Sequence, residues 1–177
     1  QLAANITDNA KGNALLLVLQ RALDMTENLG GQRKAVVFTE SRRTQQYLDQ
    51  HLQQHGYAGR TVLLNGSNTD MKAALVDHFK SADADILIST EAGGEGINLQ
   101  FCSVLINYDL PWNPQKVEQR IGRVHRYGQK NDVVVVNFVN RKNPADQRVF
   151  QLLNDKLKLF EGVFGASDEI LGAIESN

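Results

Sequence analysis

The sequence predicts an α/β fold in which a mainly parallel sheet is flanked by helices on both faces. Along most of the 177-residue chain, short apolar runs alternate with longer segments of helical periodicity. The runs are apolar at nearly every position rather than at every second one, which is typical of strands buried on both faces. Strands of this kind form the middle layer of a helix–sheet–helix arrangement.

Each apolar run is predicted to be a strand because it is rich in β-branched residues and is bounded by polar or glycine-containing turns. The last run is uninterrupted, so we expect it to be buried on both faces. The predicted strands are 35–38, 61–64, 85–89, 103–107 and 133–139.

Helix boundaries follow from capping and stop signals. Ser41 is a favourable N-cap, Gly56 and the glycines at 30–31 are helix stops, and Pro114 suits a first helical turn. The predicted helices are 9–29, 41–55, 69–80, 114–122, 149–160 and a short one from 167.

Composition and charge exclude several classes of protein. Hydrophobic residues make up 42% of the chain and charged residues 22%, as in an ordinary soluble globular domain. A formal net charge of -1 gives no overall attraction to nucleic acid, so any such binding needs a local patch. No apolar run reaches the ~18 residues of a membrane span. The single cysteine, Cys102, forms no internal disulfide, and we expect a buried thiol and a reducing compartment.

The chain shows no internal repeat, low-complexity tract or linker, so residues 1–177 are predicted to form a single domain. Because it begins at Gln1 and stops at Asn177 just after a helical pattern, we expect a fragment of a longer protein. Parallel sheets bind ligands beyond the carboxyl ends of their strands. The loops to consider are therefore 39–44, 65–68, 90–98 and 109–113.

The stretch 89–99 places three glycines directly after a strand. Glycines let backbone amides approach an anion or a neighbouring chain, and the Ser89 and Thr90 hydroxyls can bond phosphate oxygens. An irregular turn that needs positive φ explains the glycines equally well. The stretch lacks both the lysine of a P-loop and the final glycine of a dinucleotide-binding fingerprint, which argues against a nicotinamide-dependent enzyme.

The loop 108–114 holds the only tryptophan, Trp112, between two prolines. A tryptophan there either packs against the edge of the core or stacks on a ligand, and packing is the commoner outcome. Asp109 in the same loop either caps the following turn or positions an arginine, and capping is commoner.

The segment 119–129 places Arg120, Arg123 and Arg126 three residues apart beside Gln119. Helical geometry then predicts a compact cluster of guanidinium groups. Guanidinium binds phosphate through two parallel hydrogen bonds and stays charged. A solvated basic helix face is the alternative. The four histidines and the lone cysteine have no metal-ligand spacing, so no metal site built from this chain is expected.

Taken in order, five segments resemble the motifs of the second RecA-like domain of superfamily two helicases. They are 36–40, 64–67, 89–99, 107–111 and 119–129, and the resemblance spans about 35–139. The sequences of the last three segments are similar to the Swi/Snf-type branch, and within it to the prokaryotic RNA-polymerase-associated ATPase. This resemblance implies a RecA-like three-layer sandwich with a C-terminal helical extension at 144–177.

The resemblance also implies a role for each loop. Residues acting on ATP bound by the first RecA-like domain are Gln119 and the arginine fingers Arg123 and Arg126. Positions near the nucleotide are Gly94, Glu95, Gly96 and Asn98, although many relatives have Asp in place of Asn98. Positions that contact the nucleic-acid backbone are Thr39, Arg42, Gly66, Ser67, Ser89, Thr90 and Trp112.

The chain has no P-loop lysine and no Asp-Glu pair after a strand, so ATP and Mg²⁺ are expected to be held mainly by an N-terminal RecA-like lobe of the same polypeptide. The resemblance implies the C-terminal motor lobe of an ATP-dependent translocase or helicase, inactive in isolation, in a prokaryotic cytoplasm at the nucleoid. Expected partners are double-stranded DNA, the N-terminal lobe, and RNA polymerase or other proteins, with no membrane. A non-catalytic RecA-like module that binds nucleic acid or protein is the alternative. RNA as substrate and strand separation stay open.

Overall fold

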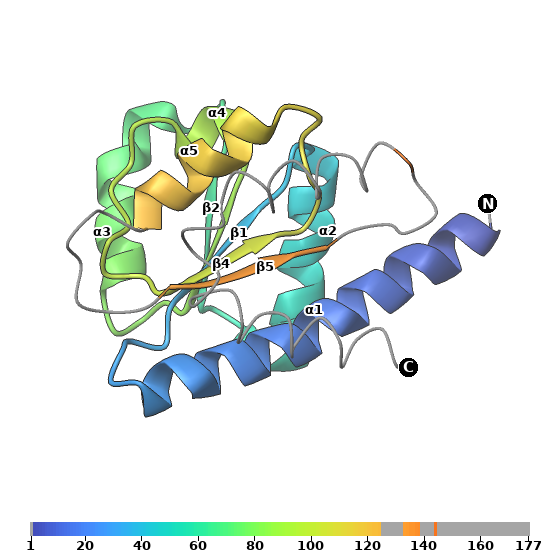
Figure 1. Ribbon diagram of the computed structural model, residues 1–177, viewed down its shortest axis with the longest axis horizontal. Coiled ribbons are helices and arrows are strands. Elements are labelled where there is room, and N and C mark those ends of the chain that lie inside the picture. The colour runs from blue at the N-terminus through green and yellow to red at the C-terminus, as the bar shows by residue number, and fades with distance from the viewer. Residues whose placement is uncertain (1, 125–132, 139–143, 145–177) are drawn as a thin grey trace.

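The computed structural model describes residues 2–124, 133–138 and 144. Five strands form one sheet with the order β2-β3-β1-β4-β5, and every neighbouring pair is parallel. The strands are β1 (Ala35–Phe38), β2 (Thr61–Leu64), β3 (Ile86–Ser89), β4 (Val104–Asn107) and β5 (Val134–Asn137). The predicted parallel α/β fold is thus confirmed, and two of the strands match their predicted bounds to the residue (Figure 1).

The helices also follow the predicted order, with differences at their ends. They are α1 (Leu2–Asn28), α2 (Arg42–Leu52), η1 (Gln53–Tyr57), η2 (Thr69–Met71), α3 (Lys72–Lys80), α4 (Glu91–Gly94) and α5 (Pro114–Val124). The first helix begins well before its predicted start, and the predicted helix 69–80 opens with a 3-10 turn. The helices predicted at 149–160 and from 167, and nearly all of the extension 144–177, lie outside the described residues.

Helix α2 shows how local signals set these boundaries. The Ser41 hydroxyl oxygen accepts a hydrogen bond from the Thr44 amide at 3.3 Å, so it satisfies one of the free N–H groups of the first turn. The helical run continues from α2 into η1, where Gly56 adopts a φ of 104°, a left-handed conformation that costs glycine little and interrupts the helical backbone. Both predictions, the serine cap and the glycine stop, are confirmed.

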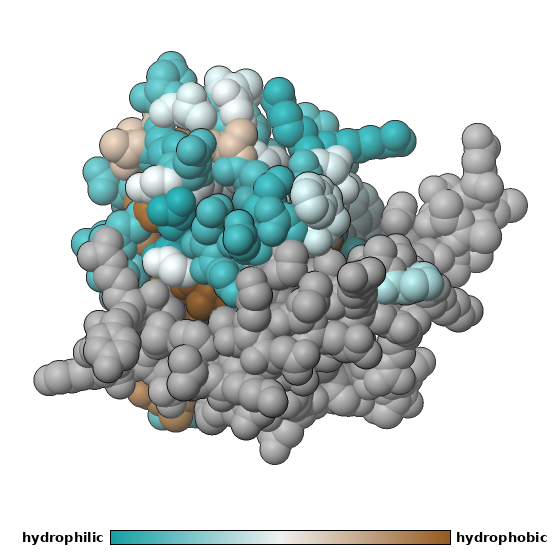
Figure 2. Space-filling view, turned by 45° about the horizontal axis from the view of Figure 1, so that its top comes forward, coloured by the Kyte–Doolittle hydropathy of each residue, from teal (hydrophilic) through white to brown (hydrophobic). Residues whose placement is uncertain are grey.

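Because all strands run in the same direction, their carboxyl ends lie along one edge of the sheet, at the top of Figure 1 beside α4 and α5. Backbone hydrogen bonds tie the first residue of each following loop to a neighbouring strand. Thr39 donates to the Ser89 carbonyl at 3.1 Å, Thr90 donates to Leu64 at 3.0 Å, and Tyr108 donates to Phe38 at 3.0 Å. Figure 2, which turns this edge toward the viewer, shows a mainly hydrophilic surface there.

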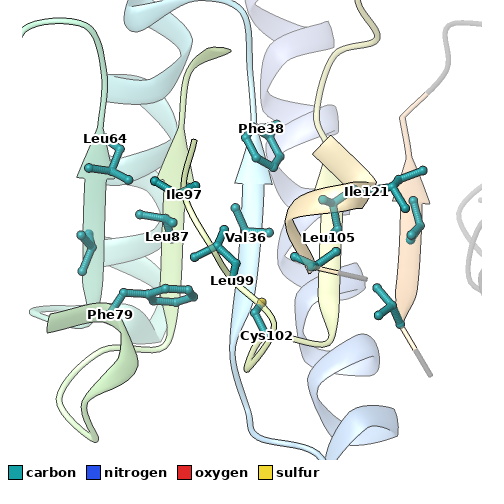
Figure 3. Packing of buried hydrophobic residues seen from close by; sticks show 14 of the residues in the cluster. Val36, Phe38, Leu64, Phe79, Leu87, Ile97, Leu99, Cys102, Leu105 and Ile121 are labelled. Carbon is teal, nitrogen blue, oxygen red and sulfur yellow. The ribbon is translucent and has the colours of Figure 1, made fainter. Parts of the chain in front are cut away.

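The core has two halves, one on each face of the sheet, because side chains alternate along a strand. In β1, Val36 and Phe38 pack on the face covered by α3 and α5, whereas Ala35 and Val37 pack on the face covered by α1 and α2. Figure 3 shows the first half, with Phe79 of α3 and Ile121 of α5 among its members. The described segments therefore form three layers, as predicted.

Cys102 lies in the first half of the core and is fully buried. Burial disfavours the thiolate and raises the pKa of the thiol to about 12. The prediction of a buried, unreactive cysteine is confirmed. None of the helices within the described ranges is both long enough and apolar enough to cross a lipid bilayer.

Leu87 in the central strands offers a test of this packing. It lies in β3 on the face covered by α3 and α5 and is 0% exposed. Leu87→Ala should therefore lower the free energy of unfolding by about 2–5 kcal/mol, through lost burial and the cavity that remains. Urea unfolding followed by circular dichroism measures the change. Leu29→Ala is the matched control: Leu29 is 61% exposed, and its truncation should change the free energy by no more than about 0.5 kcal/mol. Equal losses in the two variants would contradict the described core.

Candidate functional site

A pocket of about 480 Å³ lies at the carboxyl edge of the sheet, between α4 and α5. It brings together residues that come from separate segments of the sequence. Its lining residues are Phe38, Glu91, Ala92, Gly94, Glu95, Lys116, Gln119, Arg120 and Arg123. Four of the predicted site residues, namely Gly94, Glu95, Gln119 and Arg123, therefore meet in one pocket. Gly96 and Asn98 are exposed just beyond it, and Arg126 lies outside the described residues.

Helix α5 supplies the polar wall of this pocket. Lys116, Gln119 and Arg123 are spaced three and four residues apart, so they share one face of the helix. The opposite face carries Val117 and Ile121, which are buried against the sheet. Lys116 was missed in the sequence analysis, although its helical spacing from Gln119 and Arg123 was a usable signal.

The two described arginines of the predicted cluster have different environments. Arg123 is partly exposed and lines the pocket, whereas the Arg120 side chain is only 2% exposed. Its Nε donates to Glu91 Oε1 at 2.6 Å, and its Nη1 donates to Asn107 Oδ1 at 2.8 Å. Arg120 and Arg123 therefore line one pocket, as the predicted cluster implies, but buried acceptors draw the Arg120 side chain inward.

The charges of the pocket favour an anion. Arg120 is already paired with Glu91, which leaves Lys116 and Arg123 as cations and Glu95 as the remaining carboxylate. Within the described residues, neither Lys116 nor Arg123 forms an ion pair with a carboxylate. A guanidinium and an ammonium on one face of a helix form a donor set suited to the oxygens of a phosphate chain.

The glycine-rich stretch begins with a single helical turn, α4, and continues as an irregular segment with positive φ at Gly96, in line with the second of the two alternatives. Thr90 is its N-cap, and the Thr90 hydroxyl oxygen accepts from the Gly93 amide at 3.4 Å. A Cβ on Gly93 would lie 2.4 Å from the backbone carbon of Leu64, and a Cβ on Gly94 would lie 2.8 Å from the Phe38 ring. These two glycines therefore allow the turn to pack closely on β1 and β2. Gly96, with a φ of 76°, is the position that needs the left-handed conformation.

The residues predicted to contact nucleic acid fall into two groups. Arg42, Gly66, Ser67 and Trp112 are exposed, and Trp112 is 78% exposed. The packing of Trp112 against the core, which was the commoner of the two options, is therefore wrong; the loop 108–114 buries Tyr108 and Leu110 instead. Thr39, Ser89 and Thr90 are buried.

Two of the buried hydroxyls already have partners within the chain. Ser89 Oγ donates to the Thr90 carbonyl at 2.9 Å, and Thr39 Oγ1 donates to Asp109 Oδ2 at 2.5 Å. The Asp109 carboxylate also accepts from the Glu40 amide at 2.9 Å, so it joins the loops after β1 and β4. Among the described residues, an arginine reaches only the main-chain carbonyl of Asp109, which accepts from Arg120 Nη1 at 3.3 Å. Loss of hydration and the nearby Asp109 raise the pKa of Glu40.

Buried amides stabilise the ends of β2 and β3, a feature that the sequence analysis missed. Gln45 Nε2 donates to the carbonyls of Leu64 and Ile88, both at 2.8 Å. Asn65 in turn donates to Gln45 Oε1 at 3.1 Å, and Asn65 Oδ1 accepts from the amide and hydroxyl of Ser67. These bonds fix the shape of the loop 65–68 that presents Gly66 and Ser67. Buried polar groups need such partners, but the sequence does not reveal that Gln45 faces inward.

Comparison with known proteins identifies the family. The model of the helicase conserved C-terminal domain matches residues 15–128. This chain belongs to that family. The Bacillus subtilis protein described as uncharacterized ATP-dependent helicase YqhH is 42% identical over 172 residues, which cover 97% of this chain and 29% of that protein. Helicase swr1 of Aspergillus fumigatus is 32% identical over 145 residues, or 80% of this chain and 8% of that protein. The chain thus spans less than a third of either relative.

Solved structures agree with the family. The C-terminal part of the Fun30 ATPase domain has a TM-score of 0.60 and 28% identity, over 68% of this chain and 38% of that chain. Domain 2 of the DEAD-box helicase Mss116p, solved with an RNA duplex, has a TM-score of 0.62 at 18% identity, over 82% of this chain and 56% of that chain, and shows the fold alone. The helicase C-terminal domain described here is a RecA-like lobe of superfamily two, with Swi/Snf-type relatives, as the motifs implied.

The family implies use of ATP, and the pocket of this helicase C-terminal domain fits part of that molecule. Lys116, Gln119 and Arg123 provide donors for phosphate oxygens on one wall, and the exposed Gly96 and Asn98 follow the turn α4 that forms the other. Nothing in the described ranges groups three or more His, Cys, Asp or Glu side chains in a way that could hold a metal ion.

Alanine substitutions at Gly93 in α4, which is closely packed, and at Gly122 in α5, which has open space, should have opposite effects on stability. Gly93→Ala should lower the free energy of unfolding by about 1–3 kcal/mol, because its methyl group meets the backbone of β2 and the following loop. Gly122→Ala in α5 is the control. A Cβ there has open space within 4 Å, so the variant should be more stable by about 0.5–1 kcal/mol through helix propensity. Urea unfolding measures both, and a neutral Gly93→Ala would contradict the described position of α4.

Proposed function

We propose that this chain is the C-terminal motor lobe of an ATP-dependent nucleic-acid translocase, and that it supplies arginine fingers to ATP bound on an N-terminal lobe. The observation that carries the proposal is the pocket at the carboxyl edge, where Gln119 and Arg123 of α5 face Glu95 and Gly94 beside α4. This edge is where parallel sheets bind ligands. YqhH, whose match covers 97% of this chain and 29% of YqhH itself, is described as an ATP-dependent helicase.

The composition of the pocket supports a division of labour between two lobes. Arg123 and Lys116 can neutralise phosphate charge, but the chain lacks a P-loop lysine and an Asp-Glu pair for Mg²⁺. The phosphates and the metal must then be bound mainly by another lobe, for which the remaining length of YqhH leaves room. The site would be complete only when the two lobes close, and closure would therefore control turnover.

Each residue of the pocket has a specific role in this proposal. ATP, when bound between the lobes, supplies the free energy of phosphoanhydride hydrolysis. Arg123 donates hydrogen bonds to the transferring phosphoryl oxygens and stabilises the charge that develops there. Gln119, one turn earlier on the same face, orients the attacking water or the phosphate. Lys116 adds a more distant positive charge. Arg126 is proposed as the second finger by its place in the motif.

Binding of nucleic acid is proposed for the exposed part of the same edge. Arg42 at the start of α2, Gly66 and Ser67 after β2, and Trp112 after β4 all emerge from loops at the carboxyl ends of the strands. Guanidinium, hydroxyl and backbone N–H groups bind phosphates without reading sequence. A translocase needs this kind of contact, because it must bind every register of the backbone equally. Double-stranded DNA is the proposed substrate, in line with the Swi/Snf-type relatives.

The finger assignment predicts the kinetics of one variant. In the full-length parent protein, Arg123→Ala should lower the kcat of ATP hydrolysis by about 10³-fold or more, because the charge stabilising the transition state is removed. Steady-state hydrolysis should be measured without nucleic acid and with duplex DNA, single-stranded DNA or RNA. The 177 residues alone should show no turnover under any of these conditions.

Arg21→Ala is the matched control for that experiment. Arg21 is an exposed arginine of α1 on the other face of the sheet, and its loss should leave kcat unchanged. Turnover near wild type in Arg123→Ala would refute the finger. No hydrolysis by the wild-type parent under any condition would favour a non-catalytic binding module instead.

The nucleic-acid surface predicts a change in salt dependence. Arg42→Gln should weaken duplex-DNA binding by the parent protein and reduce the slope of log affinity against log salt by about 1, the effect of losing one phosphate contact. Fluorescence anisotropy across a salt series measures both. Arg33→Gln is the control, because it removes the same charge at a different place. Arg33 lies at the opposite edge of the sheet, where it pairs with Asp24 and Glu27 at 2.7 Å. Equal slopes for the two variants would place the DNA elsewhere.

A further inference from the structure

Arg120 is the most deeply buried charged side chain in the part of the chain that the structure describes. It contacts elements on several sides. Besides its bonds to Glu91 and Asn107, its Nη1 donates to the Asp109 carbonyl at 3.3 Å, and its guanidinium lies 5.1 Å from the centre of the Phe38 ring. Nη2 forms an ion pair with Glu91 Oε1. One guanidinium thus joins α5 to α4, to β4 and its following loop, and to the end of β1.

The partners of Arg120 are themselves held in place. Asn107 Nδ2 donates to Asn137 Oδ1 at 2.6 Å, which leaves the Asn107 side-chain oxygen directed to the arginine. Glu91 is the first residue of α4, and α4 is fixed on β2 by the close approach of Gly93 to the chain at Leu64. The direction of the Arg120 side chain therefore determines how α5 is rotated against the sheet.

The glycine-rich segment is joined to α5 at a second point. The Leu99 amide donates to the Arg123 carbonyl at 2.9 Å. The segment therefore binds α5 at both of its ends, through Glu91 to Arg120 and through Leu99 to Arg123, one helical turn apart. Because both joints are on the same short helix, they link the position of the glycine-rich segment to the position and rotation of α5.

A purely stabilising role does not account for this arrangement. Removing two charges from water is costly, and an apolar pair of equal volume often stabilises a protein as well as a buried ion pair does. An ion pair differs from an apolar pair because its hydrogen bonds form in only one orientation of the helix, so it fixes that orientation. The loop 65–68, on which α4 packs, presents Gly66 and Ser67 of the proposed nucleic-acid surface.

We propose that Arg120 and Glu91 form a positioning pair that couples the nucleic-acid-contacting loops to the orientation of Arg123. The inference rests on the proposed function and adds the route by which nucleic acid stimulates turnover. Binding at the exposed loop after β2 sets the position of α4, which packs on that loop; Glu91 transfers that position to Arg120, and α5 then presents Arg123 in its reactive geometry. A misplacement of about 1 Å in such geometry costs on the order of 10²-fold in rate.

The test uses the full-length parent protein with two variants on different elements. Glu91→Gln keeps the shape of the side chain but removes the charge, and Arg120→Lys keeps the charge but loses the forked geometry. In each, the DNA-stimulated kcat should fall about 10- to 100-fold, while KM for ATP stays within about twofold. The double variant should be no slower than the slower single variant, because residues that act as a unit are not additive.

Asp85→Asn is the matched control. Asp85 pairs with Arg60 at the amino edge of the sheet, so the variant breaks an arginine–carboxylate pair far from the pocket. It should leave kcat, KM and the stimulation by DNA unchanged. Thermal unfolding of all variants shows whether any loss of activity follows the folded fraction.

Three results would overturn the positioning pair. The first is a DNA-stimulated kcat within twofold of wild type in both single variants. The others are falls in kcat that multiply in the double variant, or a fall in kcat that only follows the folded fraction. Because the two substitutions lie on different helices, one folded variant is enough to test the pair. Measuring Arg123→Ala in parallel distinguishes failure of the proposed function from failure of the coupling alone. If that variant keeps its turnover, the proposed function fails; if it loses turnover while Glu91→Gln and Arg120→Lys do not, only the coupling fails.

Discussion

Parallel pairing of the five strands is the constraint on which the rest of this structure depends. Strands that run in one direction end at one edge, so loops that are distant in the sequence are brought together there. The bonds from the Thr39, Thr90 and Tyr108 amides to neighbouring strand ends fix the first residue of each loop. The pocket between α4 and α5 exists because the loops after β3 and β4 begin on strands that are both paired with β1.

The edge combines a rigid support with exposed polar groups. Gln45, Asn107 and Arg120 are buried and use their side chains to satisfy carbonyls, amides or carboxylates of the loops. Arg42 and Trp112 project from the loops so fixed. Sites are more precise when their supporting residues are locked by packing and hydrogen bonds, and here that support is part of the sheet itself.

Under the proposed function, this lobe supplies only one side of the ATP site. Arg123 is placed by a helix whose orientation is set from beneath by Glu91 and Asn107, while the nucleotide is bound from the opposite side by another lobe. Hydrolysis then requires both closure of the lobes and the correct rotation of α5. Two conditions that must be met together allow nucleic acid to control turnover without touching the nucleotide.

Local patterns in the sequence determined the strands, the caps and the family. The runs 35–38 and 61–64 are apolar and bounded by polar residues, so their ends are set locally. Ser41 caps α2 and Gly56 ends the helical run that continues through η1, both for local reasons. Tertiary structure decided the rest. Glycines disfavour a helix, yet α4 forms because Gly93 and Gly94 let it pack on β1 and β2. Arg120 and Arg123 have the same spacing and chemistry, but only the positions of Glu91 and Asn107, far along the chain, turn one inward and leave the other at the pocket. Such choices depend on which partners the sheet brings within reach, and a linear pattern does not contain that information.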